Sequence, residues 1–165
     1  MKAKWVLALL VVSICVAGYA GNVLATTKAG PTTTILGKAT FDQFNLSGKT
    51  HPADLWRAKL KTHGLSDLYV VDNKFAAGTD TGWHSHPGPS LILVVSGTVT
   101  NYMGDDPTCT PHTYSAGSGF VDAGGKDVHI LRNESGAAAE TIAVQLLPNG
   151  AARKTDAPDP GNCHF

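Results

Sequence analysis

The sequence has few charged residues and almost no glutamate. Of its 165 residues, 16% are charged, and only two are glutamates, Glu134 and Glu140. The 13 lysines and arginines equal the 13 aspartates and glutamates in number and form no basic cluster. Because a nucleic-acid-binding face needs clustered positive charge, we expect no nucleic-acid partner. Intrinsic disorder is excluded as well, since 42% of the residues are hydrophobic and the net charge is zero.

A sustained helical repeat is also missing. No segment has apolar residues at the 3.6-residue spacing of an amphipathic helix. Instead, 18 glycines and 9 prolines separate short stretches rich in β-branched residues, as in strands joined by tight turns. We predict one all-β domain over residues 35–148, preceded by an extended lead-in over 26–34 and followed by a Pro/Gly-rich tail over 149–165. The predicted strands are 35–41, 55–61, 68–75, 91–95, 98–103, 113–114, 119–121, 129–133 and 140–147.

The N-terminal segment is typical of a secretory signal peptide. Two lysines within the first four residues precede an apolar run over 5–17, and small residues follow it. The run is short for an uncleaved membrane anchor, the alternative interpretation. We predict a signal peptide over 1–25, cleaved after Ala20 or Ala25. The mature protein is then expected to be secreted or periplasmic, with no membrane partner.

The cysteines agree with export. Cys15 lies in the apolar run, which leaves Cys109 and Cys163 as an even pair in the mature chain. In an oxidising compartment such a pair forms a disulfide, and this one would stabilise the fold by about 4 kcal/mol. Two free thiols, or a metal site that includes His164, are the alternatives. We predict the disulfide.

Three of the seven histidines have the spacing of a metal site. His84 and His86 are two residues apart, so on a strand their side chains share one face. His129 begins a later strand and could complete a three-nitrogen site. Neutral imidazole suits iron, zinc, copper and nickel better than magnesium or calcium. The other four histidines lie in polar or loop contexts and are expected to be exposed: His51, His63, His112 and His164.

The first histidine pair stands in a pattern that resembles the first motif of the cupins, G-x5-H-x-H-x3/4-E-x6-G. Gly78, His84, His86 and Gly97 match this motif, and Ser90 stands at the position of its glutamate. The second cupin motif, G-x5-P-x-G-x2-H-x3-N, is matched less fully.

In the second motif His129 and Asn133 have the right spacing. Its proline is missing, and Gly124-Gly125 stand one or two positions early. The resemblance implies a single cupin jelly-roll β-barrel, also called a double-stranded β-helix. It also implies a divalent metal held inside the barrel by His84, His86 and His129.

Ser90 bears on the function that the resemblance implies. With three neutral imidazoles and a serine, the metal would keep its double positive charge and several open coordination positions, which favours anionic or enolate ligands. Cupins with three-histidine sites include iron dioxygenases. The resemblance therefore favours an iron(II)-type dioxygenase acting on a small organic molecule, with manganese, nickel, copper or zinc as alternative metals. The alternative function is a non-catalytic small-ligand-binding or structural cupin with a weak or vacant metal site.

Five further residues are predicted to line a pocket or to support the metal ligands. Tyr69 and Phe75 share one strand face, Ser90 replaces the motif glutamate, and Asn133 and Gln145 are polar residues in or at the end of apolar strands.

The apolar run over 91–95 is hydrophobic on both faces. Leu91, Leu93 and Val95 therefore need a cover outside the barrel. The two alternatives are a second subunit in a homodimer, as is common among cupins, and the segment 35–61 of the same chain.

Overall fold

The computed structural model describes residues 30–52 and 55–165. Within these ranges every regular element is a strand, and there is no helix that could span a lipid bilayer. The predicted signal peptide, both of its cleavage points and Cys15 lie outside the described residues, as do the first four residues of the lead-in.

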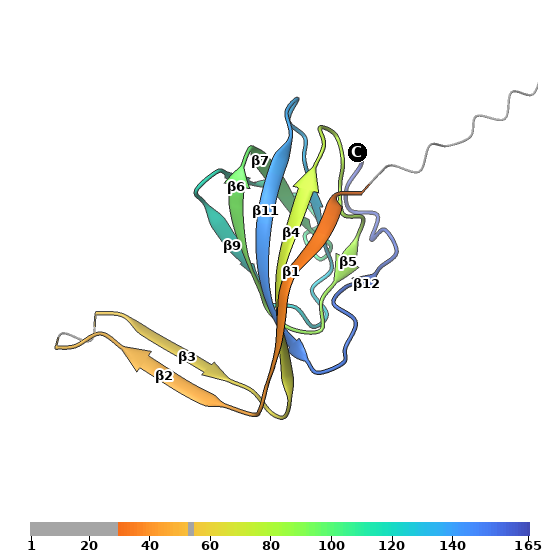
Figure 1. Ribbon diagram of the computed structural model, residues 1–165. Helices are drawn as coiled ribbons and strands as arrows, with labels where there is room; N and C mark the ends of the chain where they lie inside the picture. The colour runs from red at the N-terminus through yellow and green to blue at the C-terminus, as the bar shows by residue number, and fades with distance from the viewer. Residues whose placement is uncertain (1–29, 53–54) are drawn as a thin grey trace, which may run out of the picture.

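Two five-stranded antiparallel sheets form the body of the protein (Figure 1). The first sheet has the order β1 (Thr32–Phe41), β4 (Ser66–Phe75), β11 (Ala139–Pro148), β6 (Ser90–Ser96) and β9 (Gly119–Asp122). The second has the order β12 (Thr155–Asp156), β5 (His84–Ser85), β10 (His129–Arg132), β7 (Thr98–Met103) and β8 (His112–Ser115). From β4 onward the chain passes from one sheet to the other at almost every connection. This winding is that of a double-stranded β-helix, so the predicted all-β jelly roll is confirmed.

The core follows the period of two that a half-buried strand requires. Along β11, alternate side chains from Ala139 to Leu147 are buried, and those between them are partly exposed. One core cluster joins both sheets through Phe75, Val94, Val99 and Leu131. The inward residues of the two sheets therefore interdigitate around one barrel interior.

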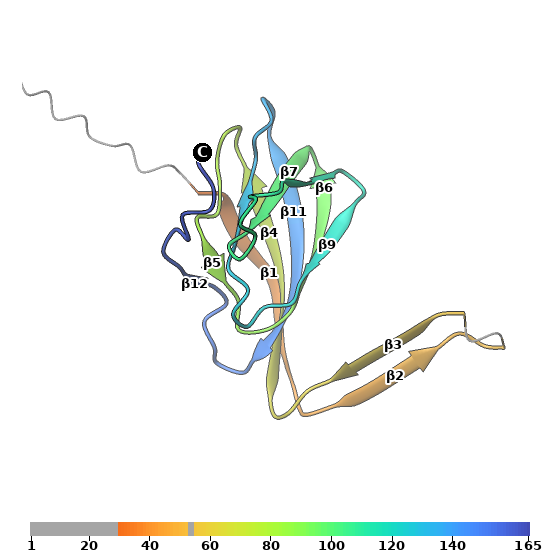
Figure 2. The same cartoon turned by 180° about the vertical axis from the view of Figure 1, so that it is seen from behind.

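Three strands are absent from the predicted set: β2 (Asn45–Lys49), the two-residue β5, and β12. β2 pairs with β3 (Arg57–Lys61) in a hairpin that projects away from the barrel (Figure 2). β12 pairs with β5, so part of the segment expected as a tail completes the second sheet. Neither β2 nor β12 shows hydrophobic alternation, because neither has a face in the core.

The predicted disulfide is confirmed. Cys109 is bonded to Cys163 with a Cα–Cα distance of 5.3 Å. Cys163 is buried in a cluster with Trp83, Tyr102 and Ile130. The bond fixes the C-terminal segment against the second sheet and is consistent with an oxidising compartment.

The expectation that residues 35–61 cover the outer face of β6 is wrong. Leu91, Leu93 and Val95 are 56%, 49% and 46% exposed. β1 lies at the far edge of the same sheet, where it pairs with β4, and the β2–β3 hairpin extends away from the barrel (Figure 1). Backbone pairing therefore places this segment beside the sheet rather than over it.

The outer face is apolar over several strands. Val121, Leu91, Val144 and Val70 stand opposite one another in a row across β9, β6, β11 and β4. A contiguous apolar surface of this kind is typical of an interface. The predicted homodimer stays a prediction, and this face is where we expect its interface.

We expect the protein to sediment at about twice the mass of a single chain and Leu91→Asp to sediment as a monomer, because a charge within an apolar interface disfavours association. Leu65→Asp is the matched control, since Leu65 is 53% exposed outside this row. Sedimentation equilibrium measures the mass. A monomeric wild type would contradict the prediction.

Asp67 links three parts of the first sheet. Its carboxylate accepts hydrogen bonds from Thr40 Oγ1 (2.6 Å), Asn149 Nδ2 (2.9 Å) and the Gly150 N–H (3.0 Å), and it forms an ion pair with Lys38 (3.0 Å). The hydrogen bonds from Thr40 and Gly150 are the main reason that the pKa of Asp67 lies well below its ordinary value. The ionised carboxylate therefore stabilises the folded state.

The pKa of Asp67 is lower in the folded than in the unfolded state. The stabilisation that its carboxylate gives is therefore fully present above the unfolded pKa of 3.8, and it is lost as the pH falls through the folded pKa. We expect the melting temperature to fall between about pH 5 and pH 2. Asp67→Asn should be less stable near neutrality and flatten this acid dependence. Asp105→Asn, at an exposed site, is the control. Equal acid slopes in Asp67→Asn and wild type would refute this role.

Candidate metal centre

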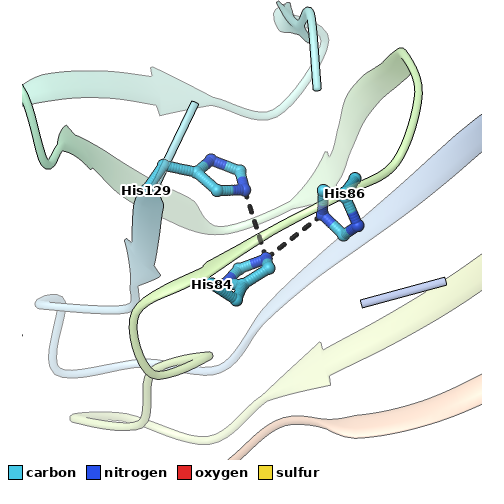
Figure 3. Close-up of side chains that lie close together, drawn as sticks. All are labelled: His84, His86 and His129. Carbon is cyan, nitrogen blue, oxygen red and sulfur yellow. Dashed lines mark hydrogen bonds between the residues drawn. The ribbon is translucent and has the colours of Figure 1, made fainter. Parts of the chain in front are cut away.

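The three histidines predicted to bind metal lie together inside the barrel. His84 is in β5, His129 pairs with it from β10, and His86 follows in the segment between β5 and β6. The Nε2 atom of His84 is 3.1 Å from Nε2 of His86 and 3.1 Å from Nε2 of His129 (Figure 3). All three rings thus present the same nitrogen to one point.

The surroundings of each ring determine which nitrogen carries the proton. Each Nδ1 faces a carbonyl oxygen, which can only accept, so each Nδ1 must be the donor and each Nε2 is unprotonated. The pairs are His84 with Gly82 O (2.8 Å), His86 with Arg153 O (2.5 Å) and His129 with Asn101 Oδ1 (3.0 Å).

The rings of His84 and His129 are also electrically neutral at ordinary pH. Burial, with the neighbouring His129 as a further cause, lowers the pKa of His84 to about 2. Burial lowers the pKa of His129 to about 4, although the nearby carboxylate of Asp122 opposes the shift. The Nε2 lone pairs therefore converge with no proton between them. A divalent transition metal satisfies such a set, because neutral imidazole nitrogen is its preferred ligand.

A cavity of about 260 Å³ adjoins the histidines. Its wall is mainly apolar and includes Val71, Ile92 and Leu131, while Arg153 and Lys154 lie at its edge. An apolar wall with a few polar groups is typical of a site for a small molecule. The three histidines supply the polar end.

Comparison with known proteins gives a likeness in fold. No family model matches the chain, and no curated protein matches it. Among solved structures, a double-stranded β-helix protein of Klebsiella pneumoniae is similar at 16% identity and a TM-score of 0.49, over 76% of this chain and 84% of that one. A cupin domain of Bordetella pertussis is similar at 14% identity and a TM-score of 0.49, over 75% of this chain and all of that one.

The DMSP lyase DddQ of Ruegeria pomeroyi is similar at 15% identity and a TM-score of 0.48, over 57% of this chain and 45% of that one. The fold assignment itself rests on the strand order of this chain and on the ring of histidines inside its barrel. The chain has the cupin fold.

Ser90 and Gln145, two of the predicted pocket residues, lie beside the histidines. Ser90 is buried in the cavity wall and accepts a hydrogen bond from Gln145 Nε2 (3.1 Å). The amide of Gln145 also lies 3.2 Å from Nδ1 of His86, and its Oε1 accepts from Arg153 (3.1 Å). Since Nδ1 of His86 donates to the Arg153 carbonyl, its contact with the amide nitrogen of Gln145 is not a hydrogen bond.

Two of the predicted pocket residues lie elsewhere. Phe75 lines the cavity, but Tyr69 packs in a core cluster and is not among the lining residues. Asn133 is buried outside the cavity, and its amide donates to the carbonyl oxygens of Ala76 (3.1 Å) and Ala137 (2.7 Å). The reason is that β10 ends at Arg132, so Asn133 organises the turn that follows.

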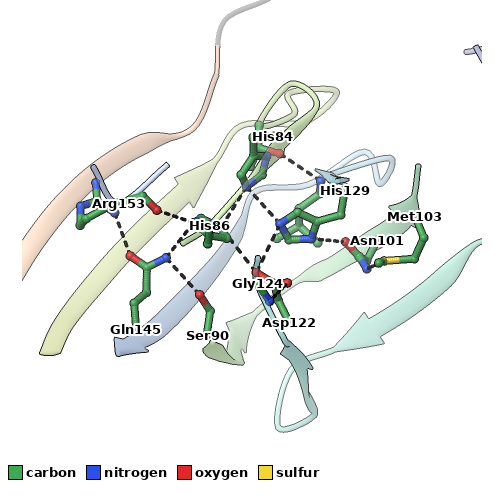
Figure 4. A network of polar contacts seen from close by, with 12 residues as sticks. His84, His86, Ser90, Asn101, Met103, Asp122, Gly124, His129, Gln145 and Arg153 are labelled. Atoms are coloured by element: carbon green, nitrogen blue, oxygen red, sulfur yellow. Dashed lines mark hydrogen bonds and ion pairs between the residues drawn. The ribbon is translucent and has the colours of Figure 1, made fainter. Parts of the chain in front are cut away.

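Three residues at the site were missed. Asn101 fixes the His129 ring, Arg153 fixes the His86 ring, and Asp122 places a carboxylate oxygen 3.8 Å from Nε2 of both His86 and His129 (Figure 4). Asp122 follows the predicted strand 119–121 and stands directly before Ala123 and a pair of glycines, which is the one local signal that could have indicated it.

We expect Asn101→Leu to weaken metal binding by about 10- to 100-fold, because His129 loses the acceptor that orients its ring and fixes its tautomer. Asn101→Asp keeps an acceptor at the same place and should bind at least as tightly as wild type. Competition with a coloured chelator, with Co²⁺ as the probe, measures both affinities. Equal affinities in Asn101→Leu and wild type would show that the contact has no such role.

Proposed function

We propose that this cupin binds a divalent transition metal, with iron(II) favoured, through Nε2 of His84, His86 and His129, and that it is a dioxygenase for a small organic molecule in the adjoining cavity. The observation that supports this most directly is the convergence of three buried Nε2 atoms, with that of His84 3.1 Å from each of the other two and all three ligand atoms within 4.8 Å of one another. Without a cation, these lone pairs would repel one another in a buried site.

When bound, the metal would supply Lewis acidity and open coordination positions for substrate and oxygen. The residues of the chain orient the ligands and form the cavity for the substrate. The Nδ1–H groups hold the rings in place through carbonyl acceptors, and the apolar cavity wall excludes water. Arg153 and Lys154 at the cavity edge favour an anionic substrate, such as a carboxylate or an enolate.

The alternative is a non-catalytic cupin that holds a small ligand. Ser90 favours it, because the hydroxyl at the position of the motif glutamate is occupied by its hydrogen bond from Gln145. Oxygen uptake separates the two functions. A dioxygenase consumes oxygen with a β-dicarbonyl, thiol or phenolic compound, whereas a binding protein shows only a ligand-dependent rise in melting temperature.

We also propose that the protein acts outside the cytoplasm. The Cys109–Cys163 disulfide supports this, because such bonds persist in oxidising compartments.

We expect the purified protein to contain close to one transition metal ion per chain by elemental analysis and His84→Ala to contain none, since His84 contacts both other ligands. His112→Ala, at an exposed histidine of β8, is the control and should keep its metal. A wild-type protein that takes up none of Fe²⁺, Mn²⁺, Ni²⁺, Cu²⁺ or Zn²⁺ would refute the proposed metal site.

A further inference from the structure

The first cupin motif places its carboxylate on β6, but in this chain a carboxylate faces the histidines from the neighbouring strand. β6 and β9 pair antiparallel, and Ser90 stands directly opposite Asp122. Residues that stand opposite each other in such a pair project from the same face of the sheet. Asp122 therefore points into the barrel beside the position where the motif glutamate would lie.

The two oxygens of the Asp122 carboxylate have different surroundings. Asp122 is 5% exposed, and its Oδ1 accepts the Gly124 N–H at 2.9 Å. Its Oδ2 is buried and has no hydrogen-bond partner among the described residues. This oxygen lies 3.8 Å from Nε2 of both His86 and His129 (Figure 4). A buried carboxylate oxygen without a donor is costly, so its position calls for a positive partner.

The histidines themselves do not supply a proton to this oxygen. Nε2 of His86 and Nε2 of His129 each lie 3.8 Å from Oδ2, which is too far for a hydrogen bond, and in a neutral ring whose Nδ1 donates to a carbonyl Nε2 is an acceptor, as Oδ2 is. Four acceptor atoms therefore surround one point: Oδ2 of Asp122 and the three Nε2 atoms. Only a cation satisfies all four at once.

Four of the six separations among these atoms are compatible with one ion. Two ligand atoms that each lie about 2.1 Å from a metal are about 3.0 Å apart at a right angle and about 4.2 Å apart when opposite. The distances of 3.1 Å between Nε2 atoms and of 3.8 Å from Oδ2 to Nε2 lie within this range.

The backbone around Asp122 holds its carboxylate in this orientation. Gly124 has a φ of +73°, and a Cβ at this position would lie 2.2 Å from the carbonyl oxygen of Gly88. Only glycine fits there, and its N–H fixes Oδ1 so that Oδ2 faces the histidines. The next N–H, that of Gly125, donates to the backbone oxygen of His86 (2.7 Å). One turn thus positions both the carboxylate and a histidine.

We propose that Asp122 is the fourth protein ligand of the metal, so that the site contains three histidines and one carboxylate supplied by β9 instead of β6. This proposal rests on the proposed metal site. A carboxylate ligand changes the expected charge of the metal site, because it reduces the net charge of a divalent ion and its ligands from two to one. A carboxylate oxygen also favours Mn²⁺ or Fe²⁺ over softer ions.

The test compares wild type, Asp122→Asn and Asp127→Asn, with Co²⁺ and Mn²⁺ as probes. Asn keeps an oxygen for the Gly124 N–H but has no charge. Asp127 is exposed and affects His129 through space only, so it controls for the loss of one charge. We expect Asp122→Asn to bind at least about 100-fold more weakly and to change the visible spectrum of bound Co²⁺. Asp127→Asn should match wild type in both.

The melting temperature of the metal-free proteins distinguishes a ligand from a structural residue. Asp122→Asn removes a buried, unpartnered charge, so its metal-free form should be at least as stable as wild type while the metal-dependent rise in melting temperature shrinks. A less stable metal-free variant, or unchanged affinity and Co²⁺ spectrum, overturns the role of Asp122 and leaves the three-histidine site standing. A wild type that binds neither probe overturns both proposals.

Discussion

The convergence of three unprotonated imidazole nitrogens is the interaction on which the rest of this structure depends. It exists only because each ring donates its other N–H to a carbonyl oxygen. The acceptors come from distant parts of the chain: the segment before β5, β7, and the segment after β11. The barrel therefore determines the protonation of the site as well as its shape. Arg153 shows this clearly, because its carbonyl reaches His86 only when the C-terminal segment lies against β5. Pairing of β12 with β5 and the Cys109–Cys163 bond hold that segment in place.

The scarcity of acidic side chains gives Asp122 its importance. Neither glutamate of the chain is at the ligand position, and Ser90 cannot compensate the charge of a metal. A carboxylate from the neighbouring strand can, because cross-strand neighbours differ in sequence position but share a face of the sheet. In the proposed site Arg153 and Lys154 would then matter more for binding an anionic substrate, since a metal of lower net charge attracts an anion less strongly.

Much of the fold and the histidine ligands could be predicted, because both depend on short-range periodicity. The two-residue spacing of His84 and His86 places them on one face, and the strands around 68–75, 98–103 and 140–147 show their apolar alternation directly. Asp122 and Asn101 could not be found this way. Their contacts depend on which strands pair and in which register, and the sequence pattern of one strand contains no information on its partner.

Other differences between the sequence predictions and the structure also arise from where strands pair and end. Residues 35–61 have apolar side chains that are compatible with a covering layer, but pairing of β1 with β4 is what determines their place. Asn133 has the spacing of a motif residue, yet the end of β10 at Arg132 turns it to the backbone carbonyls of Ala76 and Ala137.

The turn between β9 and β10 connects these observations. In the second motif the glycine pair stands early, which at first weakens the resemblance. In the structure this displacement is what brings Gly124 within reach of Asp122, while Gly125 binds the backbone of His86. A residue with a Cβ at position 124 would clash with the carbonyl oxygen of Gly88, so the turn that orients Asp122 requires a glycine there. The departure at Ser90 and the departure at the glycine pair are therefore two parts of one arrangement, in which the proposed carboxylate ligand lies on β9 and the early glycine pair of the following turn orients it.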